Sequence, residues 1–385
     1  MPHLEARGLT KVFGPDPASV LPLLERGVGK DEILERTGHT VGLQDVDVTV
    51  EPGETFVVMG LSGSGKSTLV RCLNRLIEPT AGTLTLDGVD VLSLGRGEMR
   101  ELRRHQMGMV FQRFALLPHR SVLDNVGFGL QVQGVARSER LQRAGAWVER
   151  VGLQGYEHAL PRELSGGMQQ RVGLARALAT DPEVLLMDEA FSALDPLIRR
   201  EMQDELLRLQ EELAKTIVFI THDLDEALRL GDRVAMLKDG LMVQVGTPAD
   251  IVMHPADEYV RAFVEHVDRS RVLKVRHVMR PASAVATVAA PPAVAVGAFG
   301  EGPRGPSGPP ARIPPGIPES SLEALEPERP SAGERTCLQA NMPLQDALTL
   351  VAGQPEAVAV VDAAGRIVGY LDAQTALAAL VRSRA

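Results

Sequence analysis

The sequence predicts an α/β fold built on a buried, largely parallel sheet, because two kinds of segment alternate along it before about Val267. The first kind is a short, unbroken apolar run, which is typical of a strand buried on both faces. The second is a longer stretch with apolar residues three and four apart, which is typical of a packing helix. The clearest apolar runs are residues 55–59, 184–187 and 216–220, and the clearest helical stretches are residues 138–151 and 196–213.

Length, charge and cysteine content limit the classes of protein. The chain has 385 residues, which allows two or three domains at about 150 residues each. Its net charge of -9 argues against a protein that mainly grips nucleic acid, which needs a basic surface. Two cysteines, Cys72 and Cys337, are too few for a disulfide framework or a thiolate metal site, and they indicate a reducing compartment.

The sequence contains neither the apolar core of a secretion signal at its N-terminus nor the roughly 18 consecutive apolar residues of a membrane span. If the protein serves a membrane, we therefore expect it to do so from the cytoplasmic side, through a partner.

Composition changes once, after residue 281. Residues 282–318 are mostly Ala, Val, Gly and Pro with almost no charge, which predicts a flexible linker. A compact unit follows, with the expected order helix (344–351), strand (357–361), turn (362–365), strand (367–371) and helix (374–381). About 40 residues are too few to bury a stable core alone, so this unit should pair with something.

A glycine-rich loop follows the first clear strand and opens a helix. Residues 60–68 read Gly-Leu-Ser-Gly-Ser-Gly-Lys-Ser-Thr, a pattern whose backbone N–H groups cradle a polyphosphate. Lys66 would neutralise terminal phosphate charge and Ser67 would offer a hydroxyl to Mg²⁺. The alternative, a glycine-rich turn capped by serine, is disfavoured by the flanking strand and helix. The predicted nucleotide-binding residues of this loop are Gly60, Ser62, Gly63, Ser64, Gly65, Lys66, Ser67 and Thr68.

Two acidic residues, Asp188 and Glu189, follow the apolar run at 184–187. Asp188 is placed to meet the metal, directly or through water, and Glu189 to polarise an attacking water as general base. Two acids after a strand are, taken alone, equally well the start of a loop. Their pairing with the phosphate loop favours the catalytic interpretation.

A second candidate anion site begins at Leu164-Ser-Gly-Gly-Met-Gln-Gln and continues into a helix that runs to Ala179. Ser165 is a good N-cap, and Gly166 and Gly167 leave the helix N-terminus open to an anion. The alternative is a plain helix cap. Because the phosphate loop already supplies one anion site, this second site suggests the nucleotide of another chain.

Six motifs in order make the chain resemble the ATP-binding subunits of ABC transporters from Leu9 to about Val267. They are the phosphate loop, Gln112 in Met-Val-Phe-Gln-Arg, the Leu-Ser-Gly-Gly signature, Asp188-Glu189, the loop at residues 192–195, and His222 in Ile-Thr-His-Asp. The resemblance implies an α/β P-loop NTPase core of the ABC ATPase type, with a helical subdomain at about residues 113–161. It also implies ATP and Mg²⁺ as cofactors.

The same resemblance implies roles for particular residues. Glu189, His222 and Lys66 would be catalytic, and His222 would contact the γ-phosphate. Phe13 would stack on adenine and Asp195 would lie at a dimer contact. The implied metal-binding residues are Ser67, Gln112 and Asp188, and the implied signature residues, acting on the opposing subunit's nucleotide, are Ser165, Gly166, Gly167 and Gln170.

A closer resemblance, to the subunit of glycine betaine/proline uptake systems, rests on an insertion at residues 15–40 and on four further segments, residues 73–79, 114–119, 188–199 and 223–227. It implies an ATPase that powers uptake of glycine betaine, proline or a related quaternary amine osmoprotectant. Three alternatives stay open: import of another small solute such as an amino acid or polyamine, a soluble ABC ATPase outside transport, and a regulatory ATPase acting through the tail.

Kinship also implies partners and a location. The expected assembly is a homodimer of ATP-binding subunits with two integral membrane permease subunits and a substrate-binding protein that acts through the permease, without nucleic acid. The expected location is peripheral, on the cytoplasmic face of the bacterial inner membrane.

The tail is similar to a CBS module in residues 344–380, notably at residues 358–369. Residues 278–281 resemble the opening of a first module, and the linker replaces most of the rest. Nucleotide-binding CBS modules place Ser or Thr three residues before Asp, whereas here Asp372 precedes Thr375. The expected domains are therefore residues 1–267 (ATP-binding), 268–335 (degenerate first CBS and linker) and 336–385 (CBS-like), with a structural role for the tail favoured over sensing.

Overall fold

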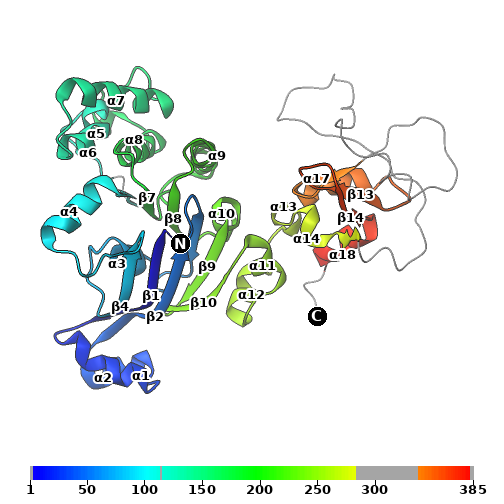
Figure 1. Ribbon diagram of the computed structural model, residues 1–385, viewed down its shortest axis with the longest axis horizontal. Helices are drawn as coiled ribbons and strands as arrows, with labels where there is room; N and C mark the ends of the chain where they lie inside the picture. The colour runs from blue at the N-terminus through cyan, green and yellow to red at the C-terminus, as the bar shows by residue number, and fades with distance from the viewer. Residues whose placement is uncertain (1–2, 113–114, 283–336, 382–385) are drawn as a thin grey trace. The chain divides into compact units, whose positions relative to one another are not determined.

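The computed structural model describes residues 3–112, 115–282 and 337–381 (Figure 1). The chain divides into two compact units, Met1–Ala262 and Phe263–Ala385. Most of the expected linker, residues 283–318, lies outside the described residues, as does Phe114 of the segment at 114–119. Within the described ranges, no helix has both the length and the apolar character that a membrane crossing requires.

A six-stranded sheet forms the centre of the first unit, in the order β10-β9-β3-β8-β7-β6. All neighbouring strands are parallel except β9 and β10, which form an antiparallel hairpin. Every residue of β3, β7 and β8 is buried, as their unbroken apolar sequences predict. The bounds are β3 (Thr55–Met59), β6 (Met107–Val110), β7 (Val184–Asp188), β8 (Thr216–Thr221), β9 (Arg233–Lys238) and β10 (Leu241–Gly246).

A second, antiparallel sheet with the order β2-β1-β4-β5 was not expected from the sequence. Its first two strands alternate buried and less buried residues over much of their length, so that one face joins the main core. The bounds are β1 (Leu4–Phe13), β2 (Thr40–Val50), β4 (Ala81–Leu86) and β5 (Val89–Asp90).

The insertion at residues 15–40 folds onto this second sheet. It forms a short 3-10 turn (Pro17–Val20) and two helices, α1 (Leu21–Glu25) and α2 (Lys30–Thr37). Val20, Leu24 and Ile33 of the insertion share a small apolar cluster with strand residues. The insertion is therefore helical, and it shares a small core with the second sheet.

Four helices form a separate apolar cluster beside the main sheet, grouped at one side of the strands in Figure 1. They are α5 (Val122–Val126), α6 (Phe128–Val132), α7 (Arg137–Arg150) and α8 (Gly166–Leu178). The cluster extends beyond the expected subdomain limit of about residue 161, because Val172 and Ala175 of α8 belong to it.

Six further helices complete the first unit or join it to the second. They are α3 (Lys66–Leu73), α4 (Arg96–His105), α9 (Pro196–Leu213), α10 (Leu224–Leu230), α11 (Pro248–Met253) and α12 (Glu258–Val264), and a 3-10 turn spans Pro161–Glu163. Because β3, β6, β7 and β8 are parallel, their carboxyl ends meet at one edge of the sheet. That edge carries the candidate site.

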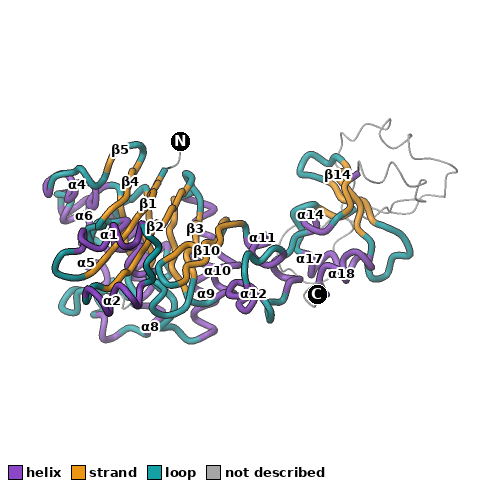
Figure 2. The backbone as a smooth tube through the Cα atoms, turned by 90° about the horizontal axis from the view of Figure 1, so that it is seen from below, coloured by secondary structure: helices purple, strands orange, loops and turns teal. Residues whose placement is uncertain are grey.

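The second unit is built around a four-stranded sheet with the order β11-β14-β13-β12. The expected tail elements are present as α17 (Leu344–Val351), β13 (Val358–Val361), β14 (Ile367–Leu371) and α18 (Ala373–Val381), with β12 (Leu338–Gln339) added. Figure 2 shows β14 together with α14, α17 and α18.

The tail packs against residues that precede the linker. Helices α13 (Arg269–Val272) and α14 (Val275–Val278) pack on α17 and α18, and β11 (Arg280–Pro281) pairs with β14. Backbone hydrogen bonds join the two stretches, from Val275 N–H to Met342 C=O and from Arg276 N–H to Ala340 C=O, each at 2.9 Å, and from Leu344 N–H to Leu273 C=O at 2.7 Å. The segment expected to be a degenerate first module is thus, where described, part of one module with the tail.

Candidate functional site

The phosphate loop closes around the side chain of Lys66. The ammonium donates to the carbonyl oxygens of Gly60 and Leu61, each at 2.9 Å. Lys66 is 4% exposed, and burial lowers its pKa, an effect opposed by the negative charges of Glu189 and Asp188. The nearest carboxylate oxygen, on Glu189, is 4.0 Å away. The positive charge is therefore held in the loop without a close counter-ion.

Two glycines let the backbone approach closely. A Cβ added to Gly60 would lie 2.1 Å from the carbonyl oxygen of Leu237. Gly65 has a φ of +105°, and a Cβ there would lie 2.6 Å from the carbonyl oxygen of Gly42. Any side chain at either position would force the loop open, so the cradle requires glycine. Between them, the Ser64 hydroxyl is buried and has no hydrogen-bond partner among the described residues.

Ser67 and Asp188 meet across the junction of α3 and β7. The Ser67 hydroxyl donates to Oδ1 of Asp188 at 2.8 Å, and Asp188 is 5% exposed. Arg71, which the sequence analysis did not single out, has its Nη2 3.8 Å from the other carboxylate oxygen. A hydroxyl and a carboxylate oxygen side by side are the hard donors that Mg²⁺ prefers.

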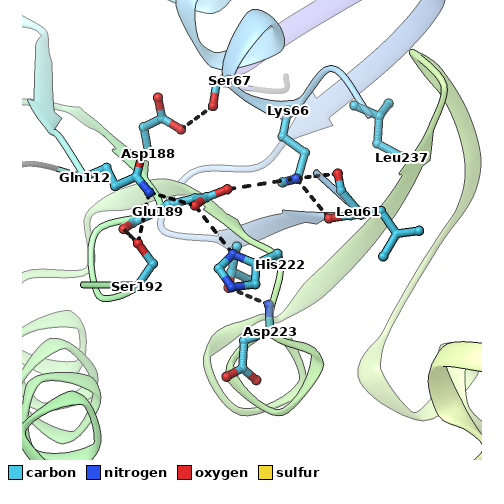
Figure 3. Close-up of polar contacts among 12 residues, drawn as sticks. Leu61, Lys66, Ser67, Gln112, Asp188, Glu189, Ser192, His222, Asp223 and Leu237 are labelled. Atoms are coloured by element: carbon cyan, nitrogen blue, oxygen red, sulfur yellow. Dashed lines mark hydrogen bonds and ion pairs between the residues drawn. The ribbon is translucent and has the colours of Figure 1, made fainter. Parts of the chain in front are cut away.

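Three residues from different loops converge on Glu189 (Figure 3). Gln112, after β6, donates from Nε2 to Oε2 of Glu189 at 3.1 Å. His222, after β8, places Nδ1 3.4 Å from the same oxygen. Ser192 donates its hydroxyl to the Glu189 carbonyl oxygen at 2.9 Å and lies 3.3 Å from Gln112 Nε2. One carboxylate oxygen thus has an amide and an imidazole beside it.

The backbone of Glu189 is itself constrained. Its φ is +47°, a left-handed conformation that is uncommon for a residue with a side chain. Its N–H donates to the Ile220 carbonyl oxygen at 3.0 Å, which ties the turn after β7 to neighbouring β8. Strain held in place by the surrounding sheet is a feature of functional positions.

The signature residues lie at the N-terminus of α8. Ser165 is exposed and caps the helix by accepting from the Met168 N–H at 3.3 Å. Gly166 is exposed, and a Cβ on Gly167 would lie 2.5 Å from Cγ2 of Ile198, so α9 packs closely there. Among the described residues, no hydrogen bond or ion pair joins Ser165 to the phosphate loop of the same chain.

Gln170 lies in a different environment from the other predicted signature residues. Its side chain is 0% exposed, and neither its amide nitrogen nor its amide oxygen has a hydrogen-bond partner among the described residues. A side chain enclosed within its own subunit has no route to another chain's nucleotide in this conformation. Gln170 is therefore not part of the exposed surface to which Ser165 and Gly166 belong.

The remaining predicted residues lie around these two groups. Phe13 is 39% exposed, its ring packs on Gly42, and the Lys11 ammonium lies 5.1 Å from the ring centroid. Asp195 is exposed and caps α9 by accepting from the Ile198 N–H at 3.1 Å. Ser62 and Gly63 are exposed at the loop tip, and Thr68 is partly buried in α3.

Tyr259 is a further neighbour of the phosphate loop that sequence reasoning missed. Its hydroxyl accepts from the Leu61 N–H at 3.4 Å and donates to the Leu237 carbonyl oxygen at 3.3 Å. The hydroxyl therefore fastens the loop to the end of β9. Tyr259 is 198 residues from Leu61 in sequence, and no local motif marks it.

Comparison with known proteins agrees with this geometry. A family profile described as ABC transporter matches residues 43–192. The glycine betaine transport ATP-binding protein OpuAA of Bacillus subtilis (strain 168) is 56% identical over 282 residues, which cover 73% of this chain and 68% of that protein. The glycine betaine/proline betaine transport system ATP-binding protein ProV of Escherichia coli (strain K12) is 55% identical over 277 residues, or 72% and 69% of the two chains.

A third relative and a solved structure extend the comparison. The trimethylamine N-oxide transport system ATP-binding protein TmoW of Ruegeria pomeroyi (strain ATCC 700808 / DSM 15171 / DSS-3) is 56% identical over 272 residues, or 71% and 80% of the two chains. The dimeric post-hydrolysis state of the ATP-binding cassette MJ0796, bound to ADP and Pi, superimposes with a TM-score of 0.54 at 31% identity. That match covers 64% of this chain and 98% of the other.

Proposed function

This chain belongs to the ABC transporter family as an ATP-binding subunit, an ATPase coupled to transport, and from that membership we propose that it powers uptake of glycine betaine, proline or a related quaternary amine. The cargo is inferred from relatives named for glycine betaine, proline betaine and trimethylamine N-oxide transport. An ATP-binding subunit does not itself contact the cargo. Its site therefore accounts for ATP hydrolysis and not for the choice of cargo.

The observation that carries the ATPase assignment is the convergence on Glu189. Its carboxylate is positioned by Gln112 and His222 and lies near the ammonium of Lys66. A carboxylate held at the mouth of a phosphate loop can accept a proton from an attacking water. Lys66 lies where negative charge on a phosphoryl group would need compensation. We therefore assign the general base to Glu189 and charge stabilisation to Lys66.

The residues present fit ATP with Mg²⁺. Gly60 and Gly65 leave room for backbone N–H groups to face phosphate, and Ser64 carries a buried hydroxyl without a partner. Ser67 and Asp188 would hold Mg²⁺, and the ion when bound would neutralise phosphate charge. Gln112, which contacts Glu189, is the third residue that kinship assigns to the ion. Phe13 offers a partly exposed ring for adenine.

We assign the facing half of each site to a second copy of the chain. Ser165 and Gly166 are exposed at the start of α8, no hydrogen bond or ion pair among the described residues joins Ser165 to its own phosphate loop, and Asp195 is exposed at the start of α9. A helix N-terminus favours a phosphate. Support comes from the related cassette MJ0796, whose structure with ADP and Pi is dimeric. Two copies would thus close on two nucleotides and reopen after hydrolysis.

The full assembly follows from kinship. We propose that the dimer works with two integral membrane permease subunits and a substrate-binding protein, as a peripheral protein on the cytoplasmic face of the bacterial inner membrane. The α5–α8 cluster would present the surface that contacts the permease, because it is a separately packed group of helices beside the nucleotide site.

For the second unit we propose a structural role, in which the described residues 269–281 and 338–381 contribute to one CBS-like module. Asp372 already accepts from the Thr375 N–H at 2.6 Å and forms an ion pair with Arg280 at 3.1 Å. Both oxygens of its carboxylate therefore already have partners within the protein, which leaves Asp372 poorly placed to bind a nucleotide.

One experiment tests the function. The chain is co-expressed with its membrane partner, reconstituted in vesicles with ATP inside, and offered radiolabelled glycine betaine, proline, methionine and putrescine. We expect ATP-dependent accumulation of the betaine. Accumulation of methionine alone would favour the amino-acid alternative. A methionine import ATP-binding protein of Xanthomonas axonopodis pv. citri (strain 306), 46% identical to this chain, is the reason for including methionine. Failure of any membrane protein to co-purify with the chain, together with no accumulation of any of the four solutes, would favour an ATPase outside transport.

A further inference from the structure

The guanidinium of Arg199 joins two loops that meet the nucleotide site from different strands. Its Nη2 donates to the carbonyl oxygens of Leu194 at 3.1 Å and Ser192 at 3.4 Å, in the loop after β7. Its Nη1 donates to Oδ2 of Asp223 at 3.2 Å, in the loop after β8. One side chain therefore connects the loop that ends in Asp195 with the residue that follows His222.

Asp223 in turn fixes the backbone on which His222 sits. Its Oδ1 accepts from the Glu226 N–H at 3.2 Å and so caps α10, while its own N–H donates to the Thr221 hydroxyl at 3.0 Å. His222 lies between Thr221 and Asp223, and its imidazole is 3.4 Å from Glu189 (Figure 3). A displacement of the carboxylate of Asp223 would therefore move the imidazole relative to Glu189.

Arg199 occupies a position that is locally unfavourable for it. It lies one turn inside the N-terminus of α9, where the helix dipole disfavours a cation. Its Nε is buried and has no hydrogen-bond partner among the described residues, and an unsatisfied buried donor also costs free energy. The three hydrogen bonds from the two Nη atoms are what offset these costs. Only a planar guanidinium fork reaches two carbonyls and a carboxylate at once.

We propose that Arg199 is a positioning residue that couples the loop at the dimer contact to His222. Contact of the partner chain with Asp195 would then keep the imidazole of His222 aligned with Glu189. This inference rests on the proposed function, because it assumes ATP hydrolysis at a site shared by two chains. It adds a regulatory link within that site, between the engagement of the second copy and the alignment of the catalytic groups.

The test compares Arg199→Gln, Arg199→Lys and Asp223→Asn with the full-length wild type. Asparagine is as good an N-cap as aspartate, so Asp223→Asn can keep α10 capped through its amide oxygen, while the charged oxygen that accepts from Arg199 is replaced by an amide NH2 group. Arg200→Gln is the matched control, since Arg200 is the exposed neighbour on the same helix. Measured are kcat, KM, the Kd of a fluorescent ATP analogue, and ATP-driven dimerisation in a Glu189→Gln background.

We expect Arg199→Gln and Asp223→Asn each to lower kcat about tenfold to a hundredfold, because a displacement of about 1 Å at a reacting group has effects of that size. The Kd for the analogue and the dimerisation should stay within about twofold of wild type, and Arg200→Gln should match wild type. The double variant should be no slower than the slower single variant, because the two groups act as one unit. Arg199→Lys, which keeps the charge but loses the fork, should recover part of the rate.

An unchanged kcat in both single variants, additive losses in the double variant, or a loss of dimerisation that accounts for the whole loss of rate would overturn the inference. If Arg199→Gln does not fold, Asp223→Asn and Arg199→Lys decide the same question. A wild-type protein that fails to hydrolyse ATP at all would instead refute the proposed function, so the two failures are distinguishable.

Discussion

Oε2 of Glu189 lies 3.4 Å from Nδ1 of His222, and the two residues follow neighbouring strands, β7 and β8, of one parallel sheet. Their loops leave the sheet at the same edge, so the register of the two strands fixes the separation of the two side chains. The side chain of Glu189 is 18% exposed and that of His222 is 54% exposed. The carboxylate is thus sheltered, while the imidazole is open to whatever approaches from solvent.

Glu189→Gln should retain ATP binding and lose turnover. The amide keeps the shape and the contact with His222 but cannot accept a proton, so we expect kcat to fall by about a hundredfold or more, within the usual effect of a general base. Steady-state hydrolysis and the Kd of a fluorescent analogue measure the two effects. The variant should also accumulate dimers with ATP, because the step that reopens them is blocked.

Glu183→Gln provides the control for that variant. Glu183 is exposed immediately before the same strand, at the end away from the site. It should hydrolyse ATP at the wild-type rate. Normal hydrolysis by Glu189→Gln would show that another group accepts the proton.

Substitutions at Ser165 should separate helix capping from contact with the opposing nucleotide. Ser165→Asn preserves the cap and should keep most of the activity. Ser165→Asp also preserves the cap but adds a negative charge where the partner's γ-phosphate is proposed to lie, so hydrolysis should be abolished. Ser165→Arg should abolish it by bulk. ATP should still bind the monomer in all three variants, measured at high dilution.

Unchanged hydrolysis in both Ser165→Asp and Ser165→Arg would remove the two-chain site from the proposal. Loss of activity in Ser165→Asn as well would indicate that the hydroxyl itself has a role beyond the cap.

Cys72 should make the free energy of unfolding decrease as the pH rises into the alkaline range. Its thiol is buried on α3, and burial raises its pKa from 9.0 to about 11. In the unfolded chain the thiol loses its proton near pH 9, whereas in the folded protein it keeps it until about pH 11. Stability is therefore lost as pH rises between these values, by on the order of 3 kcal/mol at 1.36 kcal/mol per unit. Urea unfolding of wild type and Cys72→Ala, at steps from pH 8 to pH 11, isolates this contribution.

The comparison of slopes is what matters in that experiment, because Cys72→Ala also leaves a small cavity that lowers stability at every pH. The difference between the two proteins should shrink as pH rises. A constant difference across the whole range would show that the thiol ionises alike in the folded and unfolded chains.

Local sequence patterns predicted a large part of the fold and the site. The bounds of α9 and α17 agree with the predicted helices, and β3 agrees with the predicted strand, because their periodicity and end signals are contained in the segments themselves. Lys66 and Ser67 lie together in the loop for the same reason. The position of Glu189 after a predicted strand, paired with the phosphate loop, indicated its role, whereas Gln112 was placed by resemblance. The parallel sheet explains why these distant loops meet.

What could not be predicted depends on long-range pairing. The β2-β1-β4-β5 sheet joins strands whose partners lie far along the chain, and nothing within β4 specifies its register with β1. The hydrogen bond from Tyr259 to the phosphate loop has the same character. Gln170 shows a third limit, because proximity to a motif in sequence does not reveal which face of the helix packs inward.

Truncation after Val267 should leave the ATPase intact. The first unit ends at Ala262, α12 ends at Val264, and the whole catalytic set lies before them. We expect the shortened chain to hydrolyse ATP within about twofold of wild type.

By contrast, truncation after residue 336 keeps residues 269–281 but removes the sheet and helices on which they pack. Leu273 and Val275, each 0% exposed in the full chain, would then meet water, and such newly exposed apolar surface promotes aggregation. Size-exclusion chromatography and steady-state hydrolysis of the two truncated proteins measure both outcomes. Loss of basal turnover in the protein truncated after Val267 would show that ATP hydrolysis requires the second unit. If the protein truncated after residue 336 is monodisperse and fully soluble, that result would contradict the packing of residues 269–281 on the tail.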